Sequence, residues 1–518
     1  MSDKSPFFSI LTPVFNPPDA PFAKCVESVL GQTFEDWEWC IVDDAAETSR
    51  FHEVLDALVA QDARIRSARR QVNGGIVAAS NDAAAMAEGQ FLCLLDHDDM
   101  LDPEALSEVY SAIQADGLID YIYTDEDKID SNGNCYDTFL KPAWSPERLR
   151  GQNYCCHLSA IRRSLFQAIG GFRPGFDGSQ DYDLILRVTE EARKVHHIPK
   201  VLYHWRAVEG STATSIEEKP YAFVAAQRAV QEHLNRVGID GRVVDAGFGY
   251  HKVERQMADQ PLVSVIIPTR GGAKIVRGSS KSLVLRSVDS ILANRDHYPN
   301  VEIVVVADTA TPENVICELA TRDHTTIIPY DKTFNFSDKC NLGVLGSSGD
   351  LVLLLNDDTE VISGDWLKTL VPLALEPDVG IVGPMLILED GRIQSAGHSN
   401  TPSPHNFRAG HSANQPGDFG MLAISRECSG VTGAAMLMRR EVYLEAGGMS
   451  LRFANCFNDV DLNCKVLELG YRIIWTPHAR LFHYESITRD TSVPEHEFNL
   501  LARRWLRYFD NDRFCRIN

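Results

Sequence analysis

Two short acidic clusters each follow an apolar run that is typical of a buried strand. The first reads LLDHDD at Leu94–Asp99, and the second reads LLNDDT at Leu354–Thr359. Ligands of open parallel sheets bind beyond the carboxyl ends of the strands. Mg²⁺ and Mn²⁺ prefer oxygen ligands and usually share one or two carboxylates with substrate phosphates. The pattern predicts that Asp98, assisted by Asp96, holds a cation and a diphosphate, and its repetition argues against a simple turn.

A second repeated motif places an aspartate at the start of a predicted helix. GSQDYDL contains Asp181 and CFNDVDL contains Asp459, each followed by another acid and an apolar run. A well-oriented, partly desolvated carboxylate can act as a general base for an attacking hydroxyl. The alternative is a helix cap, which the helix dipole favours. Asp181 and Asp459 are therefore the predicted catalytic bases.

A histidine follows each of these aspartates at nearly the same distance along the chain. It is His204 in VLYHWR and His483 in RLFHY. An isolated histidine beside aromatic residues at a strand end is usually a satisfied core residue, whereas neutral imidazole is also a common metal ligand. Because the motif recurs, His204 and His483 are predicted to contact a metal or a phosphate.

The second predicted strand of each half also ends in an aspartate. VDD ends at Asp44, and VAD ends at Asp308 when Glu38 is aligned with Glu302. This aspartate is shared by the two halves, so Asp44 and Asp308 are the candidates for contacting the edge of a nucleotide base. A strand-end turn is the alternative.

Short β-rich segments alternate with helical patterns, and the order of elements in residues 8–95 restarts at residues 262–355. This alternation predicts an α/β fold with mostly parallel sheets covered on both faces. Residues 238–261 contain four glycines and form the predicted linker, so the domains are predicted at residues 1–250 and 256–518. The predicted strands are 8–15, 38–42, 91–95, 262–269, 301–306 and 351–355, and the predicted helices are 22–30, 51–59, 76–87 and 283–292.

The composition limits the classes of partner and compartment. Fifty basic and 72 acidic residues give a net charge of −22, which argues against nucleic acid as a main partner. The 12 cysteines are scattered without a C-x-x-C motif, so neither a disulfide framework nor a zinc site is predicted and a reducing cytoplasm fits. No signal peptide or membrane-spanning segment is predicted. The basic, aromatic segment around Trp505 is predicted to be a terminal helix on the second domain, with peripheral contact at the inner face of the cell membrane as the alternative.

Taken together, the motifs of both halves resemble those of the inverting family 2 glycosyltransferases with a GT-A fold. In the first half the resemblance rests on SILTPVFN, VDD, NGGIVAASNDAAAMAEGQFLCLLDHDD, QDYD and HIPKVLYHWR. In the second half it rests on FNFSDKCNLGV, LLLNDDTEV, VTGAAMLMRR and FNDVDLNCKVLELGYRIIWTPHARLFHY. The arrangement is similar to that of tandem, two-domain members associated with bacterial O-antigen, capsule or other surface polysaccharide assembly.

The resemblance implies a nucleotide-diphosphate sugar donor linked to UDP, dTDP or GDP, a divalent metal (Mg²⁺ or Mn²⁺) and a glycan or lipid-linked glycan acceptor. In-line attack by the acceptor hydroxyl would invert the anomeric carbon. The implied residues are Asp181 and Asp459 as catalytic bases; Asp98, His204, Asp358 and His483 at the metal; and Thr12, Pro13, Asp44, Asn73, Asp96, Pro268, Asp308 and Asp357 at the nucleotide sugar.

The two halves differ within these motifs. Asn356 stands where the first half has Asp96, and Ala307 stands where VDD has its first aspartate. Two transfer sites with different donors or linkages are predicted. The alternative is one catalytic domain beside a non-catalytic domain that binds the acceptor or assists assembly, and these two differences make the second domain the candidate for that role.

Overall fold

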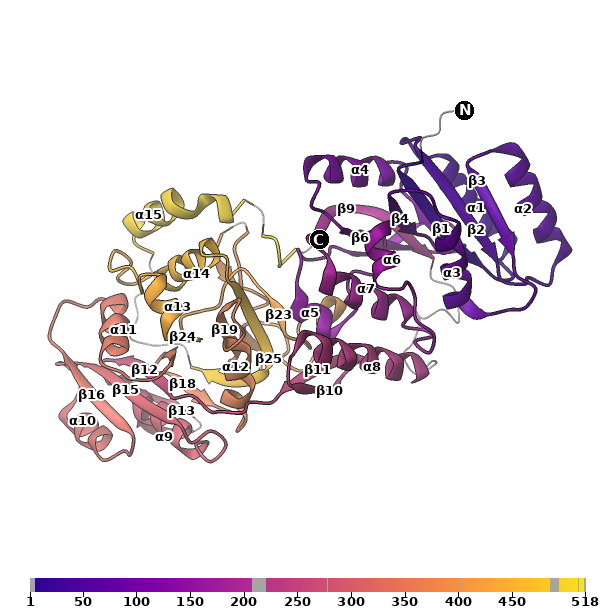
Figure 1. Cartoon of the computed structure of the whole chain (residues 1–518). Coiled ribbons are helices and arrows are strands. Elements are labelled where there is room, and N and C mark those ends of the chain that lie inside the picture. Colours follow the sequence, from indigo (N-terminus) through magenta and orange to yellow (C-terminus); the bar gives the residue numbers. More distant parts are fainter. Residues whose placement is uncertain are drawn as a thin grey trace. The chain divides into compact units, whose positions relative to one another are not determined.

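In the computed structural model the chain forms two compact α/β units, each built around one large sheet (Figure 1). The structure describes residues 5–206, 220–276, 278–401, 403–484, 493–510 and 512–516. The first unit comprises Met1–Trp144, Gln152–Asp245 and Arg516–Asn518, and the second comprises Ser145–Gly151 and Ala246–Cys515.

The sheet of the first unit has the strand order β3-β2-β1-β4-β8-β6-β9-β5, with β7 paired to β6. Its elements are β1 (Phe8–Val14), α1 (Asp19–Leu30), β2 (Trp37–Asp43), α2 (Ser49–Gln61), β3 (Ile65–Arg69), α3 (Gly75–Met86), β4 (Phe91–Leu94), β5 (Met100–Leu101), α4 (Ala105–Ala115), β6 (Tyr121–Ile129), β7 (Cys135–Phe139), β8 (Ser159–Arg162), α6 (Arg163–Ala168), α7 (Gln180–Glu191), β9 (Val195–Arg206) and α8 (Pro220–Val237).

The sheet of the second unit has the corresponding order β16-β15-β12-β17-β24-β19-β25-β18, with β20 on β19 and β23 on β25. Its main elements are α5 (Pro146–Gly151), β12 (Val263–Thr269), α9 (Leu283–Ala293), β15 (Val301–Asp308), α10 (Glu313–Ala320), β16 (Thr325–Tyr330), α11 (Phe336–Leu345), β17 (Leu351–Leu355), β18 (Thr359–Val361), α12 (Trp366–Ala374), β19 (Val379–Ile387), β20 (Ile393–Ser395), β23 (Arg426–Glu427), β24 (Ala435–Arg439), α13 (Arg440–Glu445), α14 (Asn458–Glu468), β25 (Arg472–His483) and α15 (Glu495–Trp505). The longest ladders of both sheets are parallel, which confirms the predicted α/β class.

The sequence repeat is also visible as a repeat of individual contacts. Ser9 pairs with Glu38 across β1 and β2, and Ser264 pairs with Glu302 across β12 and β15. In each unit the serine hydroxyl donates to the glutamate Oε1 over 2.6 Å. The alignment of Glu38 with Glu302 is therefore confirmed, and it makes the strand-end residues Asp44 and Asp308 equivalent.

Apolar strands are buried on both faces, as expected for a parallel sheet between helices. Alternate side chains of a strand point to opposite faces. In the second unit Val265 and Ile267 therefore lie in a core with α9, α10 and α12, whereas Ile266 lies in a separate core with α11, α13 and α14. Both cores hold the parallel strands in place, so the polar residues that follow the strand ends are fixed in position.

The backbone just before β4 packs closely against β1 at Gly89. A Cβ atom at Gly89 would lie 2.6 Å from the backbone of Phe8 and Ser9, whereas a Cβ at Gly117 of the same unit would meet nothing within 4 Å. We expect Gly89→Ala to lower the free energy of unfolding of the first unit by about 1 to 3 kcal/mol, the usual range for overpacking. Denaturant unfolding would measure this, and Gly117→Ala is the matched control. An equal effect of the two substitutions would contradict the packing.

Two further segments bear on the predictions. The interval 238–261 contains the antiparallel hairpin β10 (Gly241–Gly247) and β11 (Tyr250–Arg255).

In the C-terminal segment Trp505 is buried, and its indole Nε1 donates to Asp461 of α14 over 2.8 Å. The side chain of Trp505 therefore packs on the second unit. None of the described helices is both long and apolar enough to cross a membrane.

Candidate functional site

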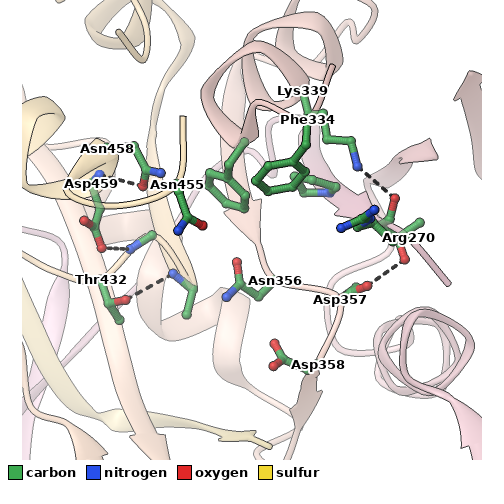
Figure 2. A pocket seen from close by; sticks show the side chains of 15 residues that line it. Arg270, Phe334, Lys339, Asn356, Asp357, Asp358, Thr432, Asn455, Asn458 and Asp459 are labelled. Atoms are coloured by element: carbon green, nitrogen blue, oxygen red, sulfur yellow. Dashed lines mark hydrogen bonds between the residues drawn. The ribbon is translucent and has the colours of Figure 1, made fainter. Parts of the chain in front are cut away.

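A cavity of about 380 Å³ opens at the carboxyl ends of the central strands of the second unit. Its lining residues come from the ends of β12 and β17, the start of α11, the segment before β24 and the start of α14. Figure 2 shows Asp459 and Asn458 at one end, Arg270 and Lys339 at the other, and Asn356 between them. Four of the predicted site residues line this cavity: Pro268, Asp357, Asp358 and Asp459.

The acidic cluster after β17 has two carboxylates in different environments. Asp357 Oδ2 accepts a hydrogen bond of 2.6 Å from the Thr269 hydroxyl, and burial together with the adjacent Asp358 raises the pKa of Asp357 to about 7. Asp358 is 2% exposed, and among the described residues its oxygens accept no hydrogen bond. Its ion-pair partner is His483, whose Nε2 lies 3.2 Å from Oδ1. Burial would raise the pKa of Asp358, but His483 lowers it below the usual range.

Asp459 is held by backbone amides at the start of α14. Its Oδ2 accepts from the amide of Gly433 over 2.9 Å, and its Oδ1 accepts from the amide of Val460 over 2.8 Å. A Cβ at Gly433 would lie 3.2 Å from the Cβ of Asp459, so the glycine allows this close approach. The arrangement fixes the carboxylate at the cavity wall, which is the orientation that a general base needs.

Two cations surround Asp308, the fourth predicted aspartate of this unit. Asp308 Oδ2 lies 3.2 Å from Arg270 Nε and 3.0 Å from Lys339 Nζ. Lys339 is 1% exposed and also donates to the carbonyl oxygen of Thr269 over 2.9 Å. Burial lowers the pKa of Lys339, and the nearby Asp308 opposes that effect. Arg270 and Lys339 both line the cavity, so they give it a positively charged end that suits an anionic ligand.

The first unit has a cavity of about 430 Å³ at the equivalent end of its sheet. Five predicted substrate or metal residues line it: Pro13, Asp44, Asn73, Asp96 and Asp98. The carboxylate of Asp44 accepts hydrogen bonds of 2.8 Å from the amides of both Gly74 and Gly75, and it pairs with Arg70 at 3.0 Å. The main chain that begins α3 therefore already binds both oxygens of Asp44.

Thr12, by contrast, does not line this cavity. It is fully buried, and its hydroxyl accepts a bond of 2.9 Å from the indole Nε1 of Trp39. The structure thus places Thr12 in the core of the first unit, where it supports β1 and β2.

The acidic cluster after β4 lies beside a histidine that the motifs do not indicate. Ligand atoms of Asp96, Asp99 and His157 all lie within 4.8 Å of one another. Burial raises the pKa of Asp98, against the opposing effect of His97, and burial with Asp96 and Asp98 raises that of Asp99 well above its usual range.

The predicted base of the first unit belongs to the same neighbourhood. Asp181, at the start of α7, accepts a bond of 2.9 Å from the Asn153 side chain. Burial raises the pKa of Asp181, whereas His157 lowers it and Asp96 adds a smaller increase. Asn153 also accepts a bond of 3.4 Å from the amide of Cys156, the residue before His157, so Asn153 joins Asp181 to the segment that carries this histidine.

His204 and His483 occupy different positions in their sheets. Thr359, directly after Asp358, pairs with His483, whereas His204 pairs with Met100, which is two residues after Asp98. Neighbouring strand positions point to opposite faces. His204 accordingly contacts Asp127, with Nδ1 2.6 Å from Oδ1, and in the described part of the chain it forms no ion pair with Asp98.

Comparisons with known proteins connect these sites to a family. The family described as "Glycosyl transferase family 2" matches residues 9–170, and the family described as "Glycosyltransferase like family 2" matches residues 261–511. The two matches lie one after the other and include all of the acidic clusters. The predicted resemblance is therefore confirmed in both halves of the chain.

Three curated proteins show the range of relatives. The chain is 38% identical to "Uncharacterized protein y4gI" of Sinorhizobium fredii over 96% of its length and 56% of that protein. It is 33% identical to "O-antigen biosynthesis protein RfbC" of Myxococcus xanthus over 98% of its length and 39% of that protein. It is 32% identical to "Chondroitin synthase" of Escherichia coli over 45% of its length and 33% of that protein. The chain thus spans between a third and rather more than half of the length of these relatives.

Proposed function

The chain belongs to glycosyltransferase family 2 and carries two such domains in tandem, and on this premise we propose that both units transfer sugars from nucleotide-diphosphate donors to a growing bacterial surface polysaccharide or related glycan. The observation that carries the proposal is the cavity of the second unit. It combines a buried carboxylate, an oriented second carboxylate and two cations. This is the set of groups that displacement of a nucleoside diphosphate by a hydroxyl requires.

Residues at the two ends of the cavity in the second unit would have different roles. Asp459 accepts the proton of the acceptor hydroxyl as that oxygen attacks the anomeric carbon, and attack opposite the leaving group inverts the configuration. Arg270 and Lys339 lie at the other end of the cavity, where their charges stabilise the diphosphate. Asp308, between these two cations, is the proposed contact for the nucleotide base.

The same cavity suits a divalent metal. Asp358 is a buried carboxylate that accepts no hydrogen bond from the described residues, and His483 lies beside it. His483 offsets the cost of burying this charge, and the carboxylate has further lone pairs that could bind a metal. Asp358 and His483 are the proposed ligands, and Mg²⁺ or Mn²⁺ would supply electrostatic stabilisation of the departing diphosphate. In the first unit Asp96, Asp99 and His157 fit the same role, with Asp98 beside them.

A specific difference supports the asymmetric alternative, with one catalytic and one non-catalytic unit. Gly89 of the first unit corresponds to Gly349 of the second. At the distance before Gly349 where the second unit has Lys339, the first unit has Ala79 before Gly89, so it lacks this lysine. In addition, backbone amides already bind both carboxylate oxygens of Asp44, the residue proposed to contact the nucleotide base. On these grounds the first unit, rather than the second, is the candidate for acceptor binding or assembly.

The proposed donors are UDP-, dTDP- or GDP-linked sugars, and the proposed acceptor is a glycan or a lipid-linked glycan. The relatives named for O-antigen biosynthesis and chondroitin synthesis support the polysaccharide class. All twelve cysteines are free, which suits a reducing cytoplasm. We place the reaction there, with peripheral contact at the inner face of the membrane if the acceptor is lipid-linked.

A thermal-shift screen tests the proposal directly. UDP, dTDP and GDP are added with and without Mn²⁺ or Mg²⁺, because a ligand that binds the folded state raises its stability. We expect a metal-dependent rise in Tm with at least one nucleotide. A protein that is folded and responds to none of them would contradict nucleotide-sugar transfer.

Lys339 gives a sharper test of the charged end of the cavity. We expect Lys339→Met to weaken binding of the responding nucleoside diphosphate about tenfold, because a charge-assisted hydrogen bond is lost. Isothermal titration calorimetry measures this. Lys332→Met is the control, since Lys332 pairs with Asp338 and its side chain is 60% exposed. Unchanged affinity in Lys339→Met would exclude a phosphate contact for this lysine.

A further inference from the structure

A group of three metal-ligating side chains lies in the first unit on β6, β7 and β9. Asp127, Cys135 and His204 each place a ligand atom within 4.8 Å of the other two. Asp127 is buried, His204 is partly buried and Cys135 is exposed, so the group is held by the sheet and open to solvent on one side. Neither the acidic cluster nor Asp181 belongs to it.

The geometry of the three side chains separates a metal site from a nucleophilic triad. A Cys–His–Asp triad uses both ring nitrogens, one toward the thiol and one toward the carboxylate. Here the Asp127 carboxylate and the Cys135 thiol approach the same nitrogen, with 2.6 Å from His204 Nδ1 to Oδ1 and 3.8 Å from Nδ1 to Sγ. His204 cannot relay a proton between them in this arrangement. Three donor atoms converging on one point is instead the geometry of a metal centre.

We propose that Asp127, Cys135 and His204 form a binding site for Zn²⁺ or a similar borderline-soft divalent ion. Bonds of 2.0 to 2.3 Å in a tetrahedral site separate ligand atoms by about 3.3 to 3.8 Å, so a small opening of the Asp127–His204 contact suffices. The metal forms bonds to Sγ, Nδ1 and a carboxylate oxygen, the thiol proton leaves to solvent, and the imidazole proton resides on Nε2. Water takes the fourth position.

The ligand set also distinguishes this centre from the sites proposed for transfer. Mg²⁺ and Mn²⁺ favour oxygen ligands, whereas a thiolate with imidazole selects zinc-like ions. One thiolate and one carboxylate neutralise the charge of the ion. Partial burial of the thiol and the nearby carboxylates of Asp127 and Asp130 raise the pKa of Cys135, so the site binds metal more weakly in acid, where the thiol keeps its proton.

Cobalt provides a probe that reports the sulfur ligand directly. The full chain, stripped of metal and kept reduced without added thiol, is titrated with Co²⁺ while the thiolate-to-cobalt charge-transfer absorption is recorded. We expect a saturable band that Zn²⁺ abolishes, since Zn²⁺ binds such ligands more tightly than Co²⁺. This readout does not depend on glycosyl transfer, so it tests the metal site separately from the proposed function.

Matched cysteine variants decide whether the band comes from this site. Cys135 and Cys317 are both exposed, and Cys317 lies in the second unit. We expect Cys135→Ser to remove the band, Cys317→Ser to keep it, and Asp127→Asn to weaken Co²⁺ binding at least about tenfold. Absence of the band in the wild-type chain, or its persistence in Cys135→Ser, would overturn the proposal.

Discussion

We expect replacement of Asp459 by asparagine to lower kcat of the transfer proposed for the second unit by about 10²- to 10⁴-fold, the usual contribution of a general base. Asparagine has nearly the same volume, and its carbonyl oxygen can still accept the Gly433 amide hydrogen bond that now reaches Asp459. We expect donor affinity to stay close to that of the wild type and Tm to fall slightly, because the asparagine NH₂ group cannot accept the second amide bond, which comes from Val460. The measurement is the steady-state release of nucleoside diphosphate in the presence of acceptor.

The control for this substitution is Asp350→Asn, at an exposed residue just before β17. It removes the same charge from the same unit without touching the cavity. A full wild-type rate in Asp459→Asn would exclude the role of general base, and an equal loss in Asp350→Asn would point to a general effect of charge.

Asp358→Asn produces the second large effect. It removes the buried carboxylate beside His483, so we expect loss of one Mn²⁺-binding site per chain and a fall in transfer of at least about 100-fold. Calorimetric titration of Mn²⁺ in the presence of the nucleoside diphosphate gives the number of sites. In EDTA we expect the variant to be less stable than the wild type at neutral pH, because His483 holds the pKa of Asp358 below its usual range and the charged carboxylate therefore stabilises the fold.

Asp365→Asn is the control for the metal experiment. Asp365 belongs to the same unit, and its side chain is 65% exposed. The Asp365→Asn variant should bind the same number of Mn²⁺ ions as the wild type. An unchanged number of sites in Asp358→Asn would show that the metal does not bind at the acidic cluster after β17.

Much of the architecture could be predicted because apolar strand patterns are local. The central strands and the helices between them lie within a few residues of their predicted positions, since each strand is buried on both faces. Edge strand β3, with the sequence IRSAR, was not predicted. Only Ile65 of this strand is buried, so the segment lacks an apolar pattern.

The sites could be predicted only as far as their motifs repeat. Asp358, His483 and Asp459 come together because the strand ends and helix starts that carry them were predicted correctly. The repeat of His204 and His483 did not reveal that they sit at different positions relative to the acidic clusters. A shift of one residue along a strand reverses the face to which a side chain points, and sequence spacing alone does not determine it.

Two functional candidates depend on contacts between distant segments. His157 joins Asp96 and Asp99 through the fold, and nothing in the sequence CCHL indicates it. Lys339 is a charged residue in a helix, which usually faces solvent, yet it is buried against Asp308. The one available signal was its counterpart Ala79 in the other half, since a difference between repeats marks a position where the two sites diverge.

The most direct test of the two-site account compares nucleoside diphosphate release by the wild type, Asp181→Asn, Asp459→Asn and the double variant. Each is assayed with a panel of UDP-, dTDP- and GDP-linked sugars, Mn²⁺ and a polysaccharide acceptor, and the linkages of the products are determined. The account predicts that each single variant loses one linkage and keeps the other, and that the double variant loses both. If Asp459→Asn alone abolished every product while Asp181→Asn lost none, the first unit would not be a transferase and the two-site account would be contradicted.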